Sequence, residues 1–282
     1  FSDKVLVLDA HARGERLTTK TMGVGPALIF DRLWRACGIA DVLTELVASR
    51  RFDFSVERAI FLTVLHRLMA PGSDRAADRW RHDYAIPGTD TLELHQLYRA
   101  MAWLGAPLPK AQQAAATPFA PRTTKDLVEE ALFARRRDLF SRLDLVFFDT
   151  TSLSFHGAGG DTLGRHGHSR DHRPDLKQMV VGMLLDGDGH PVCTELWPGN
   201  TTDVTTLIPV VDRLKQTFHV RDVCVVADRG MISAKTIEAL EAREWGYILG
   251  VRMRSSKEAQ AIAATDEGCY HTVFPRRTTT KD

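Results

Sequence analysis

The sequence predicts an α/β protein in which a mixed five-stranded sheet with flanking helices follows a mainly helical N-terminal region. In the N-terminal part, apolar residues recur at three- and four-residue spacing, and nothing resembles a strand-rich module. From residue 144 on, short β-branched and aromatic runs replace that pattern and then alternate with helical segments. Clusters of glycine, proline and aspartate separate these runs and mark where the elements begin and end.

Length and composition indicate a soluble protein of two domains. The 282 residues are enough for two cores, and contents of 44% hydrophobic and 26% charged residues are ordinary for globular chains. A net charge of +1 gives no overall basic field, although local basic patches can still bind phosphate. No apolar run reaches bilayer length and the four cysteines have no paired spacing, so we expect a cytoplasmic protein without a membrane partner.

Caps and stop signals place the helices of the N-terminal region. Ser55 begins a helix that ends at residues 71–73, where Pro, Gly and Ser interrupt the apolar pattern. Further helical patterns follow Gly25 and span residues 92–104. A loose stretch rich in Pro, Ala and Gln ends the region, and one more helix connects it to the sheet. The predicted limits are 1–122 for the helical region, 123–143 for the connecting helix and 144–254 for the sheet domain.

Five strands follow, and the connections between them set their order. Tight turns and a loop join the first three, whereas a helix separates the third from the fourth and the fourth from the fifth. We expect Thr202 or Asp203 to cap the first of these helices and Ser233 the second. Because crossover connections are right-handed, strand four is expected beside strand one, as in an RNase H-like sheet, although a different order stays open. The strands are predicted at residues 144–149, 178–185, 191–197, 223–228 and 247–251.

Strands one and four both end on a carboxylate, Asp149 in the first and Asp228 in the second. An aspartate after a strand is, taken alone, more often a turn former or a helix cap than a metal ligand. At the ends of neighbouring parallel strands, however, two such residues would lie roughly 5 Å apart. A divalent cation relieves the repulsion between carboxylates that close. The pair therefore predicts a Mg²⁺ or Mn²⁺ site suited to phosphodiester cleavage or transfer.

A loop rich in His, Arg and Lys follows strand one. Its basic side chains suit contacts with phosphate oxygens, and we predict DNA contacts for the loop and for the arginine after Asp228. The histidine spacing also suits a zinc ion, though no cysteine lies nearby. A merely solvated loop is the third interpretation, since aspartates partly neutralise its charge. The predicted DNA-binding residues are Arg165, His168, Arg170, His172, Arg173, Lys177 and Arg229.

Four ordered motifs resemble those of bacterial insertion-sequence transposases of the DDE type, and a fifth in the N-terminal region resembles a further motif of that family. The resemblance covers most of the chain, and the four ordered motifs make it specific. The motifs are LVFFDTTS at residues 145–152, GHSRDHRPDLKQ at 167–178, PGNTTD at 198–203, VVADRGM at 225–231 and HRLMAPGS at 66–73.

This resemblance implies an RNase H-like catalytic core behind a helical region that helps to bind the terminal inverted repeats of a mobile element. It implies that Asp149 and Asp228 are the first two acids of a Mg²⁺ or Mn²⁺ site. The implied function is that of a DNA transposase, which cleaves and transfers strands at those repeats. The implied partners are double-stranded DNA, at the repeats and at the target, and a second copy of the chain in a homodimer on DNA.

The third acid of such transposases is a glutamate on a helix that follows a β-rich insertion. Residues 255–282 resemble the start of that insertion, and neither Glu258 nor Glu267 has the sequence context of the third acid. The chain is therefore expected to be truncated before this residue, which would compromise strand transfer. Two other interpretations stay open: a metal-dependent nuclease of the same fold, and a non-catalytic DNA-binding remnant.

Overall fold

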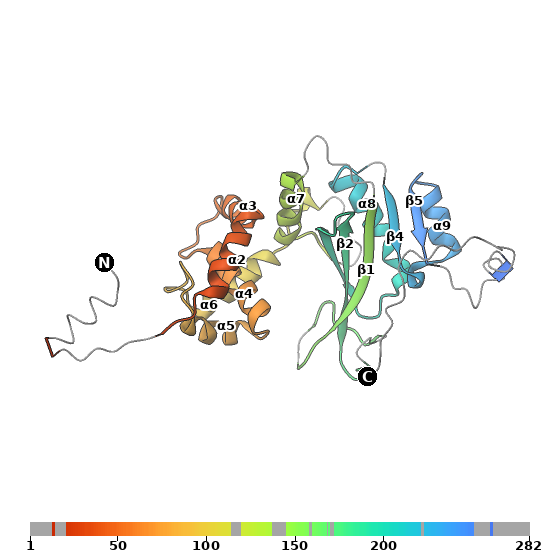
Figure 1. The fold of residues 1–282 in the computed structure, drawn as a ribbon. Helices are drawn as coiled ribbons and strands as arrows, with labels where there is room; N and C mark the ends of the chain where they lie inside the picture. The colour runs from red at the N-terminus through yellow and green to blue at the C-terminus, as the bar shows by residue number, and fades with distance from the viewer. Residues whose placement is uncertain are drawn as a thin grey trace, which may run out of the picture. The chain divides into compact units, whose positions relative to one another are not determined.

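The computed structural model describes residues 13–14, 21–113, 120–136, 145–157, 160–167, 169, 172–220, 223–250 and 260–261. The chain divides into two compact units, Phe1–Ser141 and Arg142–Asp282. The first unit is mainly helical and the second is built on a sheet, as the sequence predicts. Figure 1 shows the helices and strands of both units.

Six α-helices and two short 3-10 helices make up the described part of the first unit. None of the described helices combines the length and the apolar character needed to cross a bilayer. The α-helices are α2 (Gly25–Ala36), α3 (Ile39–Val47), α4 (Val56–Met69), α5 (Asp74–Trp80), α6 (Leu94–Leu104) and α7 (Thr124–Arg136), and the 3-10 helices are η1 (Arg81–Asp83) and η2 (Lys110–Gln112).

Helix α4 is the centre of this unit, because its residues are buried on nearly every side. Ser55 caps it as predicted, accepting a hydrogen bond from the Arg58 backbone N–H at 3.2 Å. The Arg58 guanidinium is itself buried, and it donates to Asp31 at 2.6 Å and to Glu57. Its charge is therefore matched within the core, which is the condition for burying an arginine.

Helix α7 packs within the first unit, although the sequence predicts it as a connecting helix. Its Arg135 pairs with Glu45 at 2.6 Å and with Asp41 at 3.2 Å, both on α3. The sequence analysis did not predict α3 as a separate helix. Gly38, at φ 74°, lies between α2 and α3 and lets the chain turn there.

The sheet of the second unit has the predicted order, β3-β2-β1-β4-β5. Strands β1, β2 and β3 pair antiparallel, whereas β4 and β5 run parallel to β1. Strand four thus lies beside strand one, and the RNase H-like arrangement is confirmed. The strands are β1 (Leu145–Ser154), β2 (Gln178–Asp186), β3 (Pro191–Pro198), β4 (Cys224–Ala227) and β5 (Gly246–Leu249), with α8 (Leu207–Thr217), α9 (Ala234–Glu241), η3 (Asp203–Thr205) and η4 (Arg229–Met231) between and after them.

Strand β1 is longer than predicted, and the prediction that it ends at Asp149 is wrong. The strand continues to Ser154, because β2 pairs with it along the whole stretch from Val146 to Ser154. The threonines after Asp149 are β-branched and favour this extension. Pairing with β4, by contrast, ends at Phe148. Asp149 therefore lies inside β1, at the point where β4 leaves the sheet.

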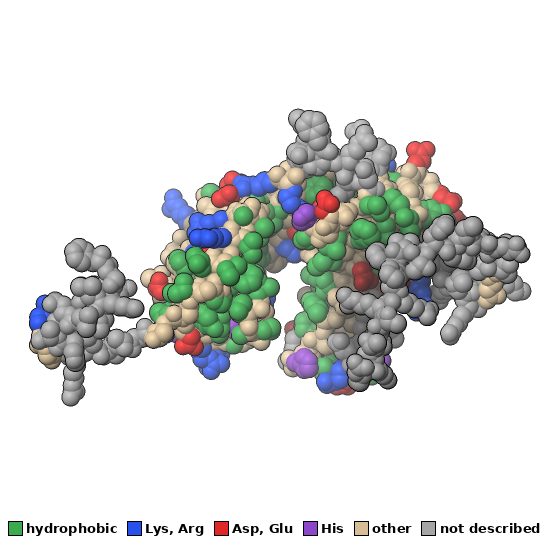
Figure 2. Space-filling view, in the orientation of Figure 1, with side chains coloured by type: hydrophobic (Ala, Val, Ile, Leu, Met, Phe, Trp, Pro, Cys, Tyr) green, Lys and Arg blue, Asp and Glu red, His purple; other side chains and the backbone are tan. Residues whose placement is uncertain are grey.

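One face of the sheet is covered and the other is open among the described residues. Burial alternates along β1, where Val146 and Phe148 are buried, and the apolar stripe of α8 is buried as well. Figure 1 shows α8 and α9 behind the sheet. On the opposite face Phe147, Leu153 and Met183 are 42%, 49% and 45% exposed. Figure 2 shows hydrophobic side chains gathered over the strands on this open face.

Of the two predicted helix caps in this unit, one is confirmed and one is wrong. Ser233 caps α9 by accepting from the Thr236 N–H at 3.1 Å. Neither Thr202 nor Asp203 caps α8, because residues 203–205 form η3 and the helix begins only after Thr206. The Asp203 carboxylate is thereby left for another contact.

Candidate active site

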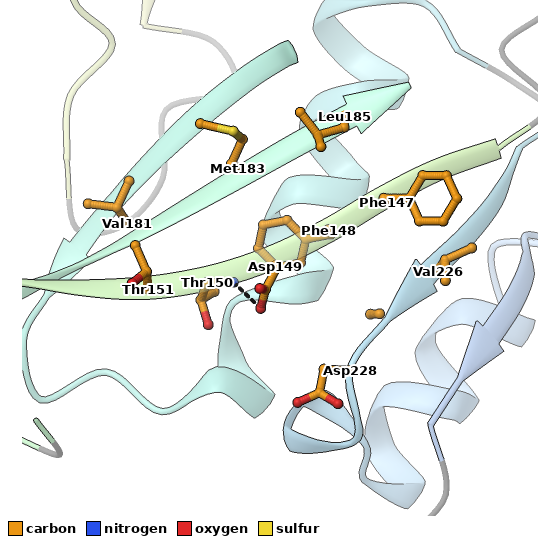
Figure 3. A pocket seen from close by; sticks show the side chains of 11 residues that line it. Phe147, Phe148, Asp149, Thr150, Thr151, Val181, Met183, Leu185, Val226 and Asp228 are labelled. Atoms are coloured by element: carbon orange, nitrogen blue, oxygen red, sulfur yellow. Dashed lines mark hydrogen bonds between the residues drawn. The ribbon is translucent and has the colours of Figure 1, made fainter. Parts of the chain in front are cut away.

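The register of the parallel strands brings Asp149 and Asp228 to neighbouring positions. Phe148 and Ala227 form the last pair between β1 and β4, and each acid is the next residue along the chain: Asp149 inside β1 and Asp228 just after β4. Both Phe148 and Ala227 are buried, so by alternation the two acids face the open side of the sheet. Adjacent strands are separated by about 5 Å. Figure 3 shows both carboxylates at the same end of the β1–β4 pair.

Both acids are exposed, and they line one groove of about 570 Å³ on the open face of the sheet. Asp149 Oδ1 accepts a hydrogen bond from the Thr150 backbone N–H at 2.7 Å, which limits its rotation. In the part of the chain that the structure describes, neither carboxylate forms an ion pair. Two threonines and seven apolar residues line the rest of the groove, namely Thr150, Thr151, Phe147, Phe148, Val181, Met183, Leu185, Val226 and Ala227.

This donor set fits a hard divalent cation. Two carboxylates without a cationic partner repel each other, and an ion bound between them removes that repulsion. Oxygen ligands at the end of a rigid sheet are what Mg²⁺ and Mn²⁺ prefer. Among the described residues, the groove runs beside both acids and provides space next to them for a substrate.

A third carboxylate, Asp203, lies next to this pair, and the sequence analysis missed its position. Its Oδ1 accepts a hydrogen bond from the Thr150 hydroxyl at 2.8 Å. Thr150 and Thr151 line both the groove and a second hollow of about 410 Å³ that contains Asp203. The signal available in the sequence was the motif at residues 198–203, which ends on this aspartate.

The predicted DNA-binding residues have different environments. The Arg165 guanidinium donates to the Gly164 carbonyl at 2.8 Å. Arg173 pairs with Asp175 through two hydrogen bonds of 2.9 and 2.8 Å; these raise the pKa of Arg173 and lower the pKa of Asp175. His172, Lys177 and Arg229 are exposed, and His172 has a φ of 56°. His168 and Arg170 lie outside the described residues.

The loop that carries Arg165 and His166 is held against the end of β3. Arg165 forms a two-way backbone bridge with Gln178, and the Gly199 N–H donates to the Leu163 carbonyl at 3.1 Å. A Cβ on Gly167 would lie 2.0 Å from the Gly199 carbonyl oxygen, and a Cβ on Gly199 would lie 2.0 Å from the Gln178 carbonyl oxygen, so both positions need glycine. Two of the sequence motifs, at residues 167–178 and 198–203, thus meet in space.

The zinc interpretation of the loop gains no support from the described residues. His166 Nδ1 lies 3.3 Å from the Pro174 carbonyl oxygen, His172 is exposed, and His168, the remaining histidine of the predicted spacing, lies outside the described residues. The described residues do contain one group of ligand atoms within 4.8 Å of one another, at Asp186, Asp188 and His190. These residues form the β2–β3 turn, where the backbone N–H groups of Asp188 and His190 donate to Asp186.

Comparison with known proteins yields a family and several distant structures. A sequence search of curated proteins finds no match. The piggyBac transposase synaptic complex with hairpin DNA is 14% identical, with 81% of this chain and 50% of that chain covered and a TM-score of 0.45. The Mos1 transposase paired-end complex with the left transposon end is 14% identical over 70% of this chain and 60% of that one, with a TM-score of 0.27. The Mos1 mariner paired-end complex with Mn is 12% identical over 70% and 59%, with a TM-score of 0.25.

The chain thus spans 50–60% of the length of these structures. The family assignment does not depend on these distant structures. It depends on a match between the sequence and the model of a protein family. The model of the Transposase DDE domain matches residues 141–282, which include the whole sheet and both acids of the groove. The matched segment consists of Ser141 and the whole second compact unit. Half of the chain is covered, and the chain belongs to the Transposase DDE domain family.

Proposed function

We propose that this chain acts as a DNA transposase in which Asp149 and Asp228 hold a Mg²⁺ or Mn²⁺ ion at the end of the β1–β4 pair. The register that makes these two acids neighbours on the open face carries the proposal. Family membership supports it independently. A bound divalent cation would activate a water or sugar hydroxyl and polarise the phosphate of a DNA strand.

The chain's own residues have distinct parts in this proposal. The Thr150 N–H keeps the Asp149 carboxylate turned toward the groove. Arg229 and Lys177 are exposed cations, and we assign them contacts with DNA phosphates. Arg173 is the weaker candidate, because Asp175 already occupies its guanidinium. The proposal assigns no residue of this sequence to the third acid.

We further propose double-stranded DNA, at terminal inverted repeats and at a target, as the substrate. Residues 1–122 would help to bind the repeats, and residues 144–254 would form the catalytic core. Two copies would act together on the two ends, because a transposition event joins both ends of an element. The bacterial insertion-sequence origin belongs to the same proposal.

The proposed site is tested by titrating Mn²⁺ into the protein in a calorimeter. Asp188→Ala serves as the background, since the hairpin group at Asp186, Asp188 and His190 could bind Mn²⁺ itself. We expect Asp149→Asn and Asp228→Asn each to weaken Mn²⁺ binding at least about tenfold, because each removes a charged ligand. Asp161→Asn, an exposed carboxylate of the same unit, is the matched control and should bind as the background does.

A second measurement separates the functions that this site could serve. The protein is incubated with supercoiled plasmid and Mn²⁺, and with labelled DNA that carries candidate terminal repeats. Nicking that depends on Asp149, together with preference for one repeat, supports the transposase. Nicking without any end preference indicates a nuclease, and metal-independent DNA binding without nicking indicates a non-catalytic remnant. Mn²⁺ binding that survives both Asn variants would contradict the site.

A further inference from the structure

Thr150 holds two carboxylates at once. Its backbone N–H donates to Asp149 Oδ1 at 2.7 Å, and its hydroxyl donates to Asp203 Oδ1 at 2.8 Å. Thr150 is only 2% exposed, and its register partner is Gly182 on β2. A buried hydroxyl needs a hydrogen-bond partner, and Asp203 accepts this hydrogen bond across 53 residues of sequence. Asp203 is therefore tied to the residue that orients Asp149.

The other carboxylate oxygen of Asp203 approaches the turn that follows Asp228. A Cβ on Gly230 would lie 3.3 Å from Asp203 Oδ2, and Asp228 Oδ2 would be 4.0 Å from that same point. The 3-10 helices η3 and η4, which carry Asp203 and Gly230, pack against each other. Asp203 thus lies close to both acids. It bonds to Thr150, the residue after Asp149, and it lies beside Gly230, two residues after Asp228.

The ordinary explanation for Asp203 would be a helix cap, and the structure does not support it. The N-cap of α8 is Thr206, and Asp203 lies within η3, where its backbone carbonyl accepts from the Thr206 N–H at 3.1 Å. Placing a third negative charge near Asp149 and Asp228 costs electrostatic energy. Asp203 adds this electrostatic cost, and its side chain accepts a specific hydrogen bond from Thr150. Its role therefore goes beyond turn formation.

We propose that Asp203 is a positioning residue for the Asp149–Asp228 pair, which fixes the two carboxylates at the spacing that one divalent cation requires. This inference rests on the proposed function. Residues that hydrogen-bond to the surroundings of metal ligands set ligand orientation, and their loss typically weakens metal binding by about 10- to 100-fold. Asp203 acts here through Thr150 and through the space beside Gly230, without touching the reacting atoms.

The test is the Mn²⁺ titration with four variants in the Asp188→Ala background. Thr150→Val keeps the shape and the β-branching but removes the hydroxyl, and Asp203→Ala removes the acceptor. We expect each to weaken Mn²⁺ binding about tenfold, and the double variant to be no weaker than either single one. Asp203→Asn keeps an acceptor for the Thr150 hydroxyl, so it should weaken binding less than Asp203→Ala.

Gly230→Ala gives a second, independent measurement. Its Cβ would press on Asp203 Oδ2 at 3.3 Å, so it should weaken Mn²⁺ binding in the background protein. In the Asp203→Ala protein the same substitution has room, and it should then have little further effect. Thermal unfolding of every variant without metal checks that the fold is retained. If Asp203 had a merely structural role, its loss would lower the melting temperature, and Gly230→Ala would weaken Mn²⁺ binding equally with and without Asp203.

Different outcomes overturn different claims. If Asp149→Asn abolishes Mn²⁺ binding while Asp203→Ala and Thr150→Val bind as the background does, the role of Asp203 is wrong and the site stands. If Asp203→Asn is as damaging as Asp149→Asn while Thr150→Val is harmless, Asp203 is a ligand and the positioning role is wrong. If the background protein fails to bind Mn²⁺, or binding survives Asp149→Asn, the proposed site fails and the role of Asp203 with it.

Discussion

Gly182 on β2 lies directly against the indole ring of Trp197 on β3. A Cβ on Gly182 would fall 2.6 Å from Cζ3 of Trp197 and 2.8 Å from Cε2 of Phe148, closer than side chains approach each other. Trp197 is fully buried, and it also meets the ring of Phe148 edge-on at 6.3 Å. Gly182 is the register partner of Thr150, so this packing lies directly beneath the candidate site.

Substitution of Gly182 by alanine should therefore destabilise the sheet unit. The extra methyl group has no space, and overpacking of a filled core costs about 1–3 kcal/mol. Urea denaturation of Gly182→Ala should show that loss in the free energy of unfolding. Gly187→Ala is the control, because the nearest atom to its Cβ would be 3.8 Å away. Equal stabilities of the two variants would contradict the packing described for Trp197.

The ion pair between Glu195 on β3 and Arg213 on α8 joins the sheet to its helix layer. Both residues are buried, at 8% and 3% exposure, and the Arg213 guanidinium also lies 5.6 Å from the centre of the Phe218 ring. Arg213→Met should lower the free energy of unfolding by about 3–5 kcal/mol, because it leaves Glu195 charged and without its arginine.

Replacing both Glu195 and Arg213 is a second test of the same ion pair. The double variant with Arg213→Met and Glu195→Leu leaves no buried charge, so urea denaturation should show a smaller loss than Arg213→Met alone. A double variant that is less stable by the sum of the two single effects would mean that the residues act independently.

The order of the sheet could be predicted because it depends on local signals and on a general rule of chain handedness. The β-branched runs before Asp149 and Asp228 identified the two central strands, and right-handed crossovers placed them side by side. The caps Ser55 and Ser233 were predictable for a similar reason, since an N-cap bonds to a backbone group only three residues away.

Contacts between distant segments could not be predicted in this way. The length of β1 depends on its pairing with β2, so Asp149 was wrongly placed at a strand end. Asp203 was wrongly expected to cap α8, because a short polar side chain before a helix usually does so. Its hydrogen-bond partner, Thr150, is 53 residues away in the sequence, and no local sequence pattern predicts such a bond.

His66 on α4 should make the first unit sensitive to pH. Its ring is 3% exposed, packs edge-on to Trp80, and has no hydrogen bond at Nδ1 within the described residues. Burial lowers the pKa of His66 below its usual value of 6.5, and the neighbouring charge of Arg67 lowers it further. The folded state therefore binds fewer protons than the unfolded chain when the pH drops through about 6.5.

Stability of this unit should consequently be complete above that pH and fall as the pH decreases through the acidic range below it. Thermal denaturation across that range would show a decreasing melting temperature, and His66→Phe, which cannot take up a proton, should flatten the curve. His82→Gln, at an exposed histidine of the same unit, should leave it unchanged. A profile of His66→Phe parallel to that of the unchanged protein would contradict this origin of the pH dependence.

Binding to DNA should increase when Asp175 is neutralised. Asp175 holds the Arg173 guanidinium through two hydrogen bonds, so the arginine is not free to meet a phosphate. Asp175→Asn removes that competitor, and we expect affinity for a short duplex to rise by less than about tenfold, since exposed ion pairs are weak. The dependence on salt should also become steeper, because one more phosphate contact releases more counterions.

Two further variants distinguish this effect from a general change in charge. Losing any negative charge favours DNA binding, so Asp175→Asn is also introduced into a protein that carries Arg173→Gln. If the gain depends on a released arginine, it should largely disappear there, whereas a purely electrostatic gain would persist. Lys177→Gln, at an exposed lysine of the same loop, should weaken binding and make the salt dependence shallower. Fluorescence anisotropy at several salt concentrations measures all of these changes, and an unaltered affinity of Asp175→Asn would remove Arg173 from the proposed DNA-contacting surface.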